Sequence, residues 1–273
     1  MKLLRTIEKV LHNPWVITPA GFAAVKQLID SKLAGGQVDV SQEDFKGTNT
    51  EFAIDRKSIS SVTISGTLGQ RLSWLEVVCG GCDYLDITNA VNESLADGAD
   101  GFLFTFDSPG GMAIGCGECA EVIASIQVPK VAFTDSLMCS GAYWLAAGCD
   151  WIVGSPSADV GSIGVIIPWI DQSKLWDELG LKFEPITSKG DSLKSTMYGP
   201  ELTDEQKAYL QEDVDQTSAA FRGHVSKNRD LDFTALRAGA YSGARALELN
   251  LIDQIGSQAD AYNELLKRVQ KAA

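Results

Sequence analysis

Along most of the chain, the spacing of apolar side chains alternates between the repeat of a β-strand and the repeat of an α-helix. Residues 61–65 alternate apolar and polar side chains as a half-buried strand does, and 101–106 is a short apolar run typical of a buried strand. Residues 87–95 and 112–126 instead place apolar side chains on one face of a helix. Because strand and helix units repeat in this order, we predict an α/β fold with a largely parallel sheet.

The same reasoning extends to both ends of the chain. Further helices are expected at 2–12, 18–34, 140–147, 173–179, 244–249 and 259–269, and further strands at 131–134, 151–153 and 183–187. A long helix begins at the capping box formed by Thr203 and Gln206. Its apolar face consists of Leu210, Val214, Phe221 and Val225. We divide the chain into a helical N-terminal extension and linker, 1–55, and one domain, 56–273.

Composition narrows the class of protein. A chain of 273 residues with 45% hydrophobic content can bury a large core without disulfides or metal. The net charge of −13 argues against a broad basic face for nucleic acid. The most apolar segments, 142–149 and 163–170, are eight residues long, whereas a membrane helix needs about 20. Charged residues also interrupt any signal-peptide core. We therefore expect a cytoplasmic protein without membrane insertion or a nucleic-acid partner.

Six cysteines raise the question of metal. Cys79 and Cys82 form one C-x-x-C pair and Cys116 and Cys119 another, which superficially resembles a four-thiolate zinc site. The second pair, however, lies on the apolar stripe of its predicted helix, where cysteine is a common core residue. We favour reduced core or loop cysteines, with no metal and no cofactor. Without a secretion signal, disulfides are not expected.

A glycine-bearing loop follows the buried strand 101–106. It reads Asp-Ser-Pro-Gly-Gly over 107–111 and precedes a predicted helix. Two glycines allow a positive φ and a close approach of the backbone to a ligand. Its free N–H groups would suit an oxyanion hole, and the alternative is an ordinary strand–helix turn.

Ser140 stands at the start of a predicted helix, beside Gly141. A serine there is either an N-cap or a nucleophile, and a nucleophile needs a base. Only two histidines exist: His12 lies in the N-terminal extension, and we expect His224 to be a partly exposed helix residue. Lys194 is the other candidate, although a lysine becomes a base only when burial or a neighbouring cation lowers its pKa from about 10.4. The alternative is that Lys194 is an ordinary solvated lysine in a loop.

Five motifs together resemble signal peptide peptidase A and its relatives. They occur in the family's order at 107–111, 140–143, 161–165, 193–195 and 242–253. The resemblance covers roughly residues 58–265. It implies a crotonase-like fold similar to the Clp protease proteolytic subunit, and a serine peptidase that uses a Ser-Lys dyad.

The resemblance also assigns roles to individual residues. It implies that Ser140 is the nucleophile and Lys194 the general base. The aromatic residue that often precedes the family's lysine is Leu193 here, so Lys189 is the reserve candidate for the base. Asn250 stands where the family has glycine, and asparagine tolerates the left-handed backbone that this position requires.

Backbone donors and a second serine complete the implied site. The N–H groups of Gly110 or Gly111 and of Gly141 would form the oxyanion hole. Ser162 would orient the lysine amine. The family's Ser-Gly-Gly-Tyr reads Ser-Gly-Ala-Tyr at 140–143, which is a small change.

The branch of the family follows from what surrounds these motifs. We expect no N-terminal anchor before the peptidase unit, and the opening segment 12–19 looks like that of phage and prophage head-maturation proteases. That branch implies a polypeptide substrate such as scaffold or capsid protein, a homo-oligomer, and a place in the host cytoplasm or prohead. The alternatives are a peptide-degrading relative of signal peptide peptidase, a catalytically inactive structural member, and an acyl-CoA enzyme of the crotonase type.

Overall fold

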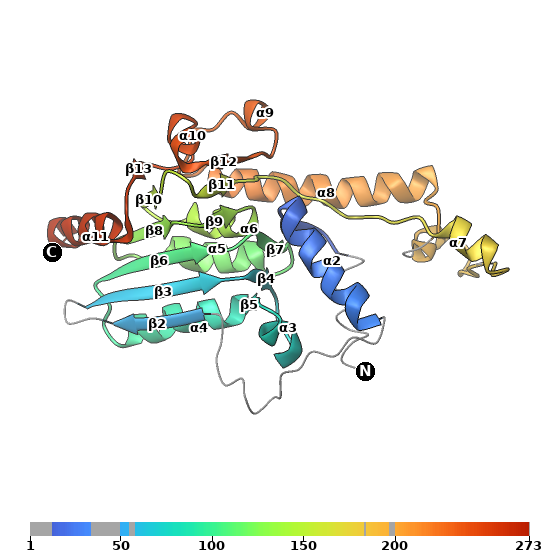
Figure 1. Ribbon diagram of the computed structural model, residues 1–273, viewed down its shortest axis with the longest axis horizontal. Coiled ribbons are helices and arrows are strands. Elements are labelled where there is room, and N and C mark those ends of the chain that lie inside the picture. The colour runs from blue at the N-terminus through green and yellow to red at the C-terminus, as the bar shows by residue number, and fades with distance from the viewer. Residues whose placement is uncertain (1–12, 34–49, 55–57, 183, 197–199, 273) are drawn as a thin grey trace.

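The structure is a computed structural model of the chain (Figure 1). It describes residues 13–33, 50–54, 58–182, 184–196 and 200–272. The predicted helix at 2–12 and most of the predicted linker lie outside these residues. The boundary at residue 55 stays a prediction, although the strand just before it joins the main sheet.

A six-stranded sheet forms the centre of the molecule. Its spatial order is β13 (Gln254–Ile255), β10 (Trp151–Gly154), β8 (Lys130–Thr134), β6 (Gly101–Asp107), β3 (Ile59–Ser65) and β2 (Thr50–Ile54). All neighbours run parallel except β2, which pairs antiparallel with β3. The central strands are apolar runs because helices cover both faces of the sheet. The predicted α/β class with a largely parallel sheet is confirmed.

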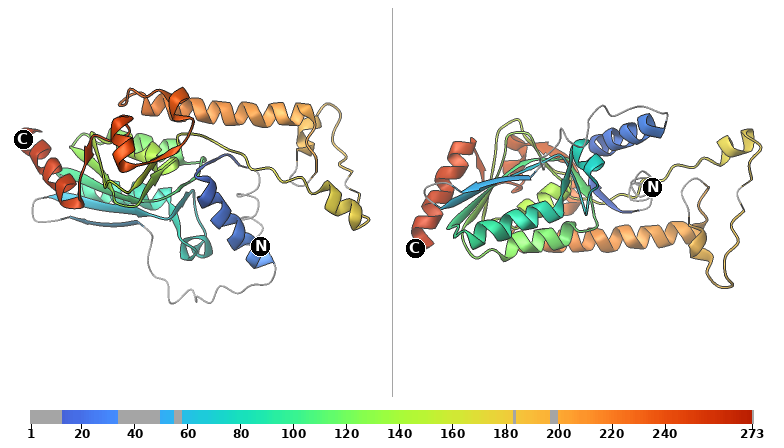
Figure 2. Two further views of the ribbon diagram at one scale, coloured as in Figure 1. Left: turned by 45° about the horizontal axis from the view of Figure 1, so that its top comes forward. Right: turned by 90° about the horizontal axis from the view of Figure 1, so that it is seen from below.

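Helices pack on both faces of this sheet (Figure 2). Alternate residues of β6 show the division: Phe102, Phe104 and Phe106 belong to the large core, whereas Leu103 belongs to a second core under the C-terminal helix. Three of the helices that contribute to the large core are α4 (Tyr84–Ala96), α5 (Cys116–Ser125) and α6 (Gly141–Ala146). The second core is closed by α11 (Gln258–Ala272), through Ala261 and Leu265.

Four parallel strands continue, after a short connection, into short strands of two smaller sheets. One sheet has the order β1 (Trp15–Ile17), β7 (Gly110–Met112), β4 (Thr67–Gly69) and β5 (Gly81–Asp83). The other has the order β12 (Ala240–Ser242), β11 (Asp159–Gly161) and β9 (Leu137–Cys139). These strands follow the carboxyl ends of β3, β6, β8 and β10, which is the edge where α/β sheets bind their ligands.

One segment extends well beyond this body. The described residues between 167 and 203, here called the arm, include α7 (Ser173–Glu178) and a 3₁₀ turn (Ser192–Ser195), and they lie beside the far end of α8 (Asp204–Val225) (Figures 1 and 2). The predicted capping box at the start of α8 is present. Phe221 and Val225, near its C-terminal end, are buried, whereas Leu210 and Val214 are half-buried. Only the C-terminal end of α8 is therefore anchored in the body.

The remaining helices are short or peripheral. They are α2 (Pro19–Leu33), α3 (Trp74–Val78), α9 (Phe233–Leu236) and α10 (Gly243–Glu248). None of the helices in the described ranges is both long and apolar enough to cross a membrane.

Two predicted elements differ from the structure. The helix expected at 112–126 begins only at Cys116, because Met112 pairs as a strand and Gly115 adopts a left-handed φ of 87°. The strand expected at 183–187 is wrong for the described part, since 184–187 is exposed and irregular. Asn250 has the predicted left-handed backbone, with φ of 59°.

Candidate active site

Ser140 occupies a strained turn between β9 and α6. Its φ of 54° and ψ of −116° lie outside the usual regions for a residue with a side chain. Such strain costs roughly 1–3 kcal/mol and is concentrated at functional sites. The hydroxyl makes no cap hydrogen bond to the helix, so Ser140 is not the ordinary N-cap residue considered as an alternative. A serine on a sharp strand-to-helix turn instead has the geometry of a nucleophile.

Two hydrogen bonds hold this turn against the last residue of β11 and the segment that follows it. The Ser140 N–H donates to the Gly161 carbonyl at 2.7 Å, and the Ser140 Oγ donates to the Gly164 carbonyl at 3.5 Å. Ser162, between these acceptors, is buried and has a φ of 55°. The structure therefore brings the segment that contains Ser162 to Ser140, and the role of Ser162 in orienting the lysine amine stays a prediction. The Gly164 carbonyl is a partner that we did not single out, although it lies within the motif at 161–165.

The glycine loop lies against the start of α6. Gly110 has a φ of 97°, and a β-carbon placed on it would stand 2.9 Å from the Gly141 nitrogen. The Gly110 N–H donates to Ser108 Oγ at 3.2 Å, which leaves Gly111 as the better oxyanion donor of the pair. A β-carbon on Gly111 would lie 1.9 Å from the Leu68 carbonyl oxygen, so only glycine fits there. Gly110, Gly111 and Gly141 are thus brought together.

Lys194 is not brought to the Ser140 of its own chain. It lies exposed in the 3₁₀ turn of the arm, and this turn is bound to the first residues of α8: Ser192 Oγ donates to Glu205 and Gln206 Nε2 donates to Ser195 Oγ. Ser140 lies toward the other end of α8, about 22 Å away along the helix at 1.5 Å per residue from Gln206 to Phe221. Lys189 is exposed on the same arm.

His224 is buried, so the expectation of a partly exposed residue is wrong. Its Nδ1 lies 3.1 Å from Glu121 Oε1 on α5. The same carboxylate accepts a hydrogen bond from Lys227 Nζ at 2.6 Å. The hydrogen bond from Lys227 and, to a smaller extent, that from His224 lower the pKa of Glu121. The ring is thus engaged with an acidic partner 103 residues away, in a structural contact.

The cysteines lie mainly in the core. Cys116 and Cys119 are buried on the apolar stripe of α5, as predicted, and Cys79 is half-buried. Desolvation raises the pKa of the Cys116 thiol to about 12 and that of Cys82 to about 11. These thiols remain protonated at neutral pH, whereas a metal ligand must be a thiolate. In the described part of the chain, no three His, Cys, Asp or Glu side chains are grouped as metal ligands.

A comparison with known families identifies the family of this chain. The model of peptidase family S49 matches residues 123–271, more than half of the chain. The chain belongs to peptidase family S49. The resemblance to the signal peptide peptidase A family is therefore confirmed, and the match includes both Ser140 and Lys194.

Its curated relatives include phage and cellular S49 peptidases. Capsid assembly protease C of Escherichia phage lambda is 28% identical over 74% of this chain and 47% of its own length. A putative signal peptide peptidase SppA of Enterococcus faecium is 33% identical over 61% of this chain and 50% of its own length. The head-tail preconnector protein GP5 of phage P21 is 26% identical over 75% of the chain and 42% of its own length. The chain spans about half the length of these relatives.

Solved structures with a related outline include a peptidase and a crotonase-type enzyme. A membrane-bound stomatin-specific protease, 1510-N, is 14% identical with a TM-score of 0.40 and covers 77% of this chain and 78% of its own. An enoyl-CoA hydratase from Shewanella pealeana is 12% identical with a TM-score of 0.49, over 83% of this chain and 78% of its own.

Proposed function

We propose that this S49 family member is a serine endopeptidase with a Ser140–Lys194 dyad, acting on scaffold or capsid polypeptides during phage head assembly. The observation that carries the chemistry is the strained turn of Ser140 beside the Gly111 and Gly141 backbone. The two phage relatives support the substrate class, because they are named for capsid assembly and for the head-tail preconnector.

The dyad would work by transferring one proton back and forth. Ser140 Oγ attacks the peptide carbonyl carbon while its proton moves to neutral Lys194 Nζ. The oxyanion accepts hydrogen bonds from the N–H groups of Gly111 and Gly141. The lysine ammonium then protonates the leaving amine, and the C–N bond breaks. Water, deprotonated by the same amine, hydrolyses the acyl-serine and restores both residues.

In the proposed enzyme, Lys194 serves the Ser140 of a neighbouring copy of the chain. The arm carries Lys194 away from its own nucleophile, so the dyad is incomplete within one protomer. Several large apolar side chains are exposed on the arm: Leu175, Leu179, Leu181 and Ile186, the last of these 96% exposed. Exposed apolar clusters of this kind are typical of protein interfaces. A homo-oligomer would both cover them and complete the site.

The activity itself is tested with an unfolded protein substrate such as denatured casein. The wild-type chain should cleave it, and Ser140→Ala should be inactive with an unchanged circular dichroism spectrum. Removing one hydroxyl that makes no cap bond should leave the fold intact. Full turnover by folded Ser140→Ala would contradict the assignment of the nucleophile.

A further inference from the structure

The N-terminal strand β1 lies against the start of α6, next to Ser140, and is hydrogen bonded along both edges. On one edge it runs antiparallel to β7, with Val16 opposite Gly111. On the other edge the Trp15 N–H donates to the Ile166 carbonyl at 2.8 Å, and the Ile166 N–H donates back at 3.0 Å. A short extended segment is thus held between the oxyanion loop and the strand-like residues that follow Ser162.

The Val16 carbonyl oxygen reaches the predicted oxyanion hole. A β-carbon placed on Gly110 would lie 2.1 Å from this oxygen, and one placed on Gly141 would lie 3.2 Å from it. Thr18 N–H donates to the Pro109 carbonyl, and Ala113 N–H to the Pro14 carbonyl. Because bonded pairs alternate in an antiparallel ladder, Val16 is also in a hydrogen-bonded position opposite Gly111. A substrate carbonyl would occupy this place during attack by Ser140.

The helix after β1 packs on the strand and holds it in place. Trp15 and Ile17 point to one side and pack with Ile29 of α2 and with Met112, whereas Val16 points to the other side, into the main core. The described residues 13–33, which contain β1 and α2, are here called the N-terminal cover. Ser140 is fully buried, with 0% of its surface exposed, and a β-carbon on the adjacent Gly141 would meet Val16 of this cover.

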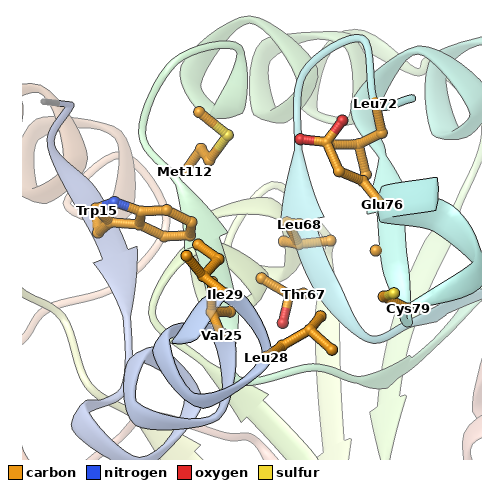
Figure 3. A pocket seen from close by; sticks show the side chains of 11 residues that line it. Trp15, Val25, Leu28, Ile29, Thr67, Leu68, Leu72, Glu76, Cys79 and Met112 are labelled. Atoms are coloured by element: carbon orange, nitrogen blue, oxygen red, sulfur yellow. The ribbon is translucent and has the colours of Figure 1, made fainter. Parts of the chain in front are cut away.

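Part of the N-terminal cover lies over a pocket of the body. This pocket, of about 90 Å³ and partly open to solvent, lies between one stretch of α2 and the residues beneath it (Figure 3). Val25, Leu28 and Ile29 line one side, and Leu68, Leu72 and Cys79 line the other. The pocket reduces the contact area that holds this stretch of α2 on the body.

We propose that the N-terminal cover is an intramolecular pseudosubstrate, in which β1 fills the extended-peptide site and must leave before a polypeptide can bind. This inference rests on the proposed peptidase function. An incoming chain would replace β1 by the same strand addition, with backbone hydrogen bonds to β7 and to Ile166. Only the fraction of molecules with β1 displaced would bind substrate, which raises the apparent KM by the inverse of that fraction.

Gly21 offers a way to release the cover by a substitution outside the proposed catalytic groups. It lies on α2, and a β-carbon there would stand 2.7 Å from Pro109 Cβ and 3.0 Å from Ile17 Cγ1. Gly21→Leu should therefore push α2 off the body. Gly223→Leu is the matched control, because a β-carbon on Gly223 meets nothing within 4 Å.

The kinetic test measures kcat and KM for denatured casein in both variants and in the wild type. The proposal predicts that Gly21→Leu lowers KM by about tenfold with kcat unchanged, and that Gly223→Leu changes neither. A folded Gly21→Leu protein with a KM equal to or above the wild-type value would overturn the proposal.

A second measurement does not depend on Gly21→Leu folding. Inactive Ser140→Ala is saturated with casein, and hydrogen exchange is followed at the Trp15 and Thr18 amides, both of which are bonded in β1. Faster exchange on binding supports displacement of the strand. Unchanged protection with casein bound refutes the pseudosubstrate and leaves the peptidase assignment standing. If the wild type does not cleave casein and Ser140→Ala does not bind it, both the pseudosubstrate and the peptidase assignment are refuted.

Discussion

The indole of Trp144 lies flat on the ring of Phe221, with ring centroids 4.6 Å apart and planes 4° from parallel. Trp144 comes one helical turn after Ser140, and Phe221 lies near the C-terminal end of α8. This contact anchors α8 at the nucleophile's end, so that its other end carries Lys194 away from the body. The proposed nucleophile and base therefore lie at opposite ends of one long helix.

Gly111 tests the oxyanion hole. Gly111→Ala should lower kcat/KM by about 10²–10³, because the added β-carbon meets the Leu68 carbonyl and displaces the N–H donor. Gly223→Ala, on an open helix face, is the control and should retain wild-type activity. Steady-state kinetics with a peptide substrate provide the measurement, and wild-type kcat/KM in folded Gly111→Ala would refute this donor.

Lys194 and Lys189 are distinguished by substitution with arginine. Guanidinium keeps the positive charge and does not deprotonate in the working range, so Lys194→Arg should be inactive and Lys189→Arg close to wild type. In the wild type, kcat/KM should rise with pH along a single ionisation, since a lysine base works only when neutral. Activity in Lys194→Arg together with loss in Lys189→Arg would reassign the base. If both retain activity while His224→Ala is dead, the Ser-Lys mechanism is wrong.

The buried cysteines give a prediction for metal and pH. Purified protein should contain far less than one zinc per chain, and native alkylation should reach half-buried Cys79 first. Burial raises the pKa of Cys116 from 9.0 to about 12, and that of Cys149 likewise. The unfolded chain thus loses these protons at lower pH than the folded chain, and the melting temperature should fall as pH rises from about 9 toward 12. Stoichiometric zinc whose removal unfolds the protein would contradict this account.

Local periodicity was sufficient to predict most elements of the body. The apolar run at 101–106 and the stripe through Cys116 and Cys119 are encoded by neighbouring residues, and the structure confirms both. Met112 lies outside the predicted helix because its pairing with Trp15 is a contact across 97 residues. A three-residue strand such as β1 leaves too little periodic signal to be recognised.

Motif order supplied the candidate site, but it could not supply the spatial arrangement. Ser140 and the glycine loop meet because parallel strands end at one edge, which follows from the fold class. The position of the arm could not be predicted from the sequence, because neighbouring residues do not determine the direction in which α8 leaves the body. His224 was misjudged because its partner, Glu121, comes from a distant helix. The motif at 242–253 ends in Asp253. Its carboxylate accepts hydrogen bonds from both Nη atoms of Arg229, and this contact is stabilising rather than catalytic.

The most direct test of the dyad and its completion between copies mixes two inactive variants. Ser140→Ala and Lys194→Arg are co-expressed so that they assemble together, and casein turnover is compared with each variant alone. Because Ser140 of one chain would meet Lys194 of the other, the mixed assembly should recover activity that neither variant has. A verified mixed oligomer that remains inactive, while the wild type cleaves casein, would contradict the account.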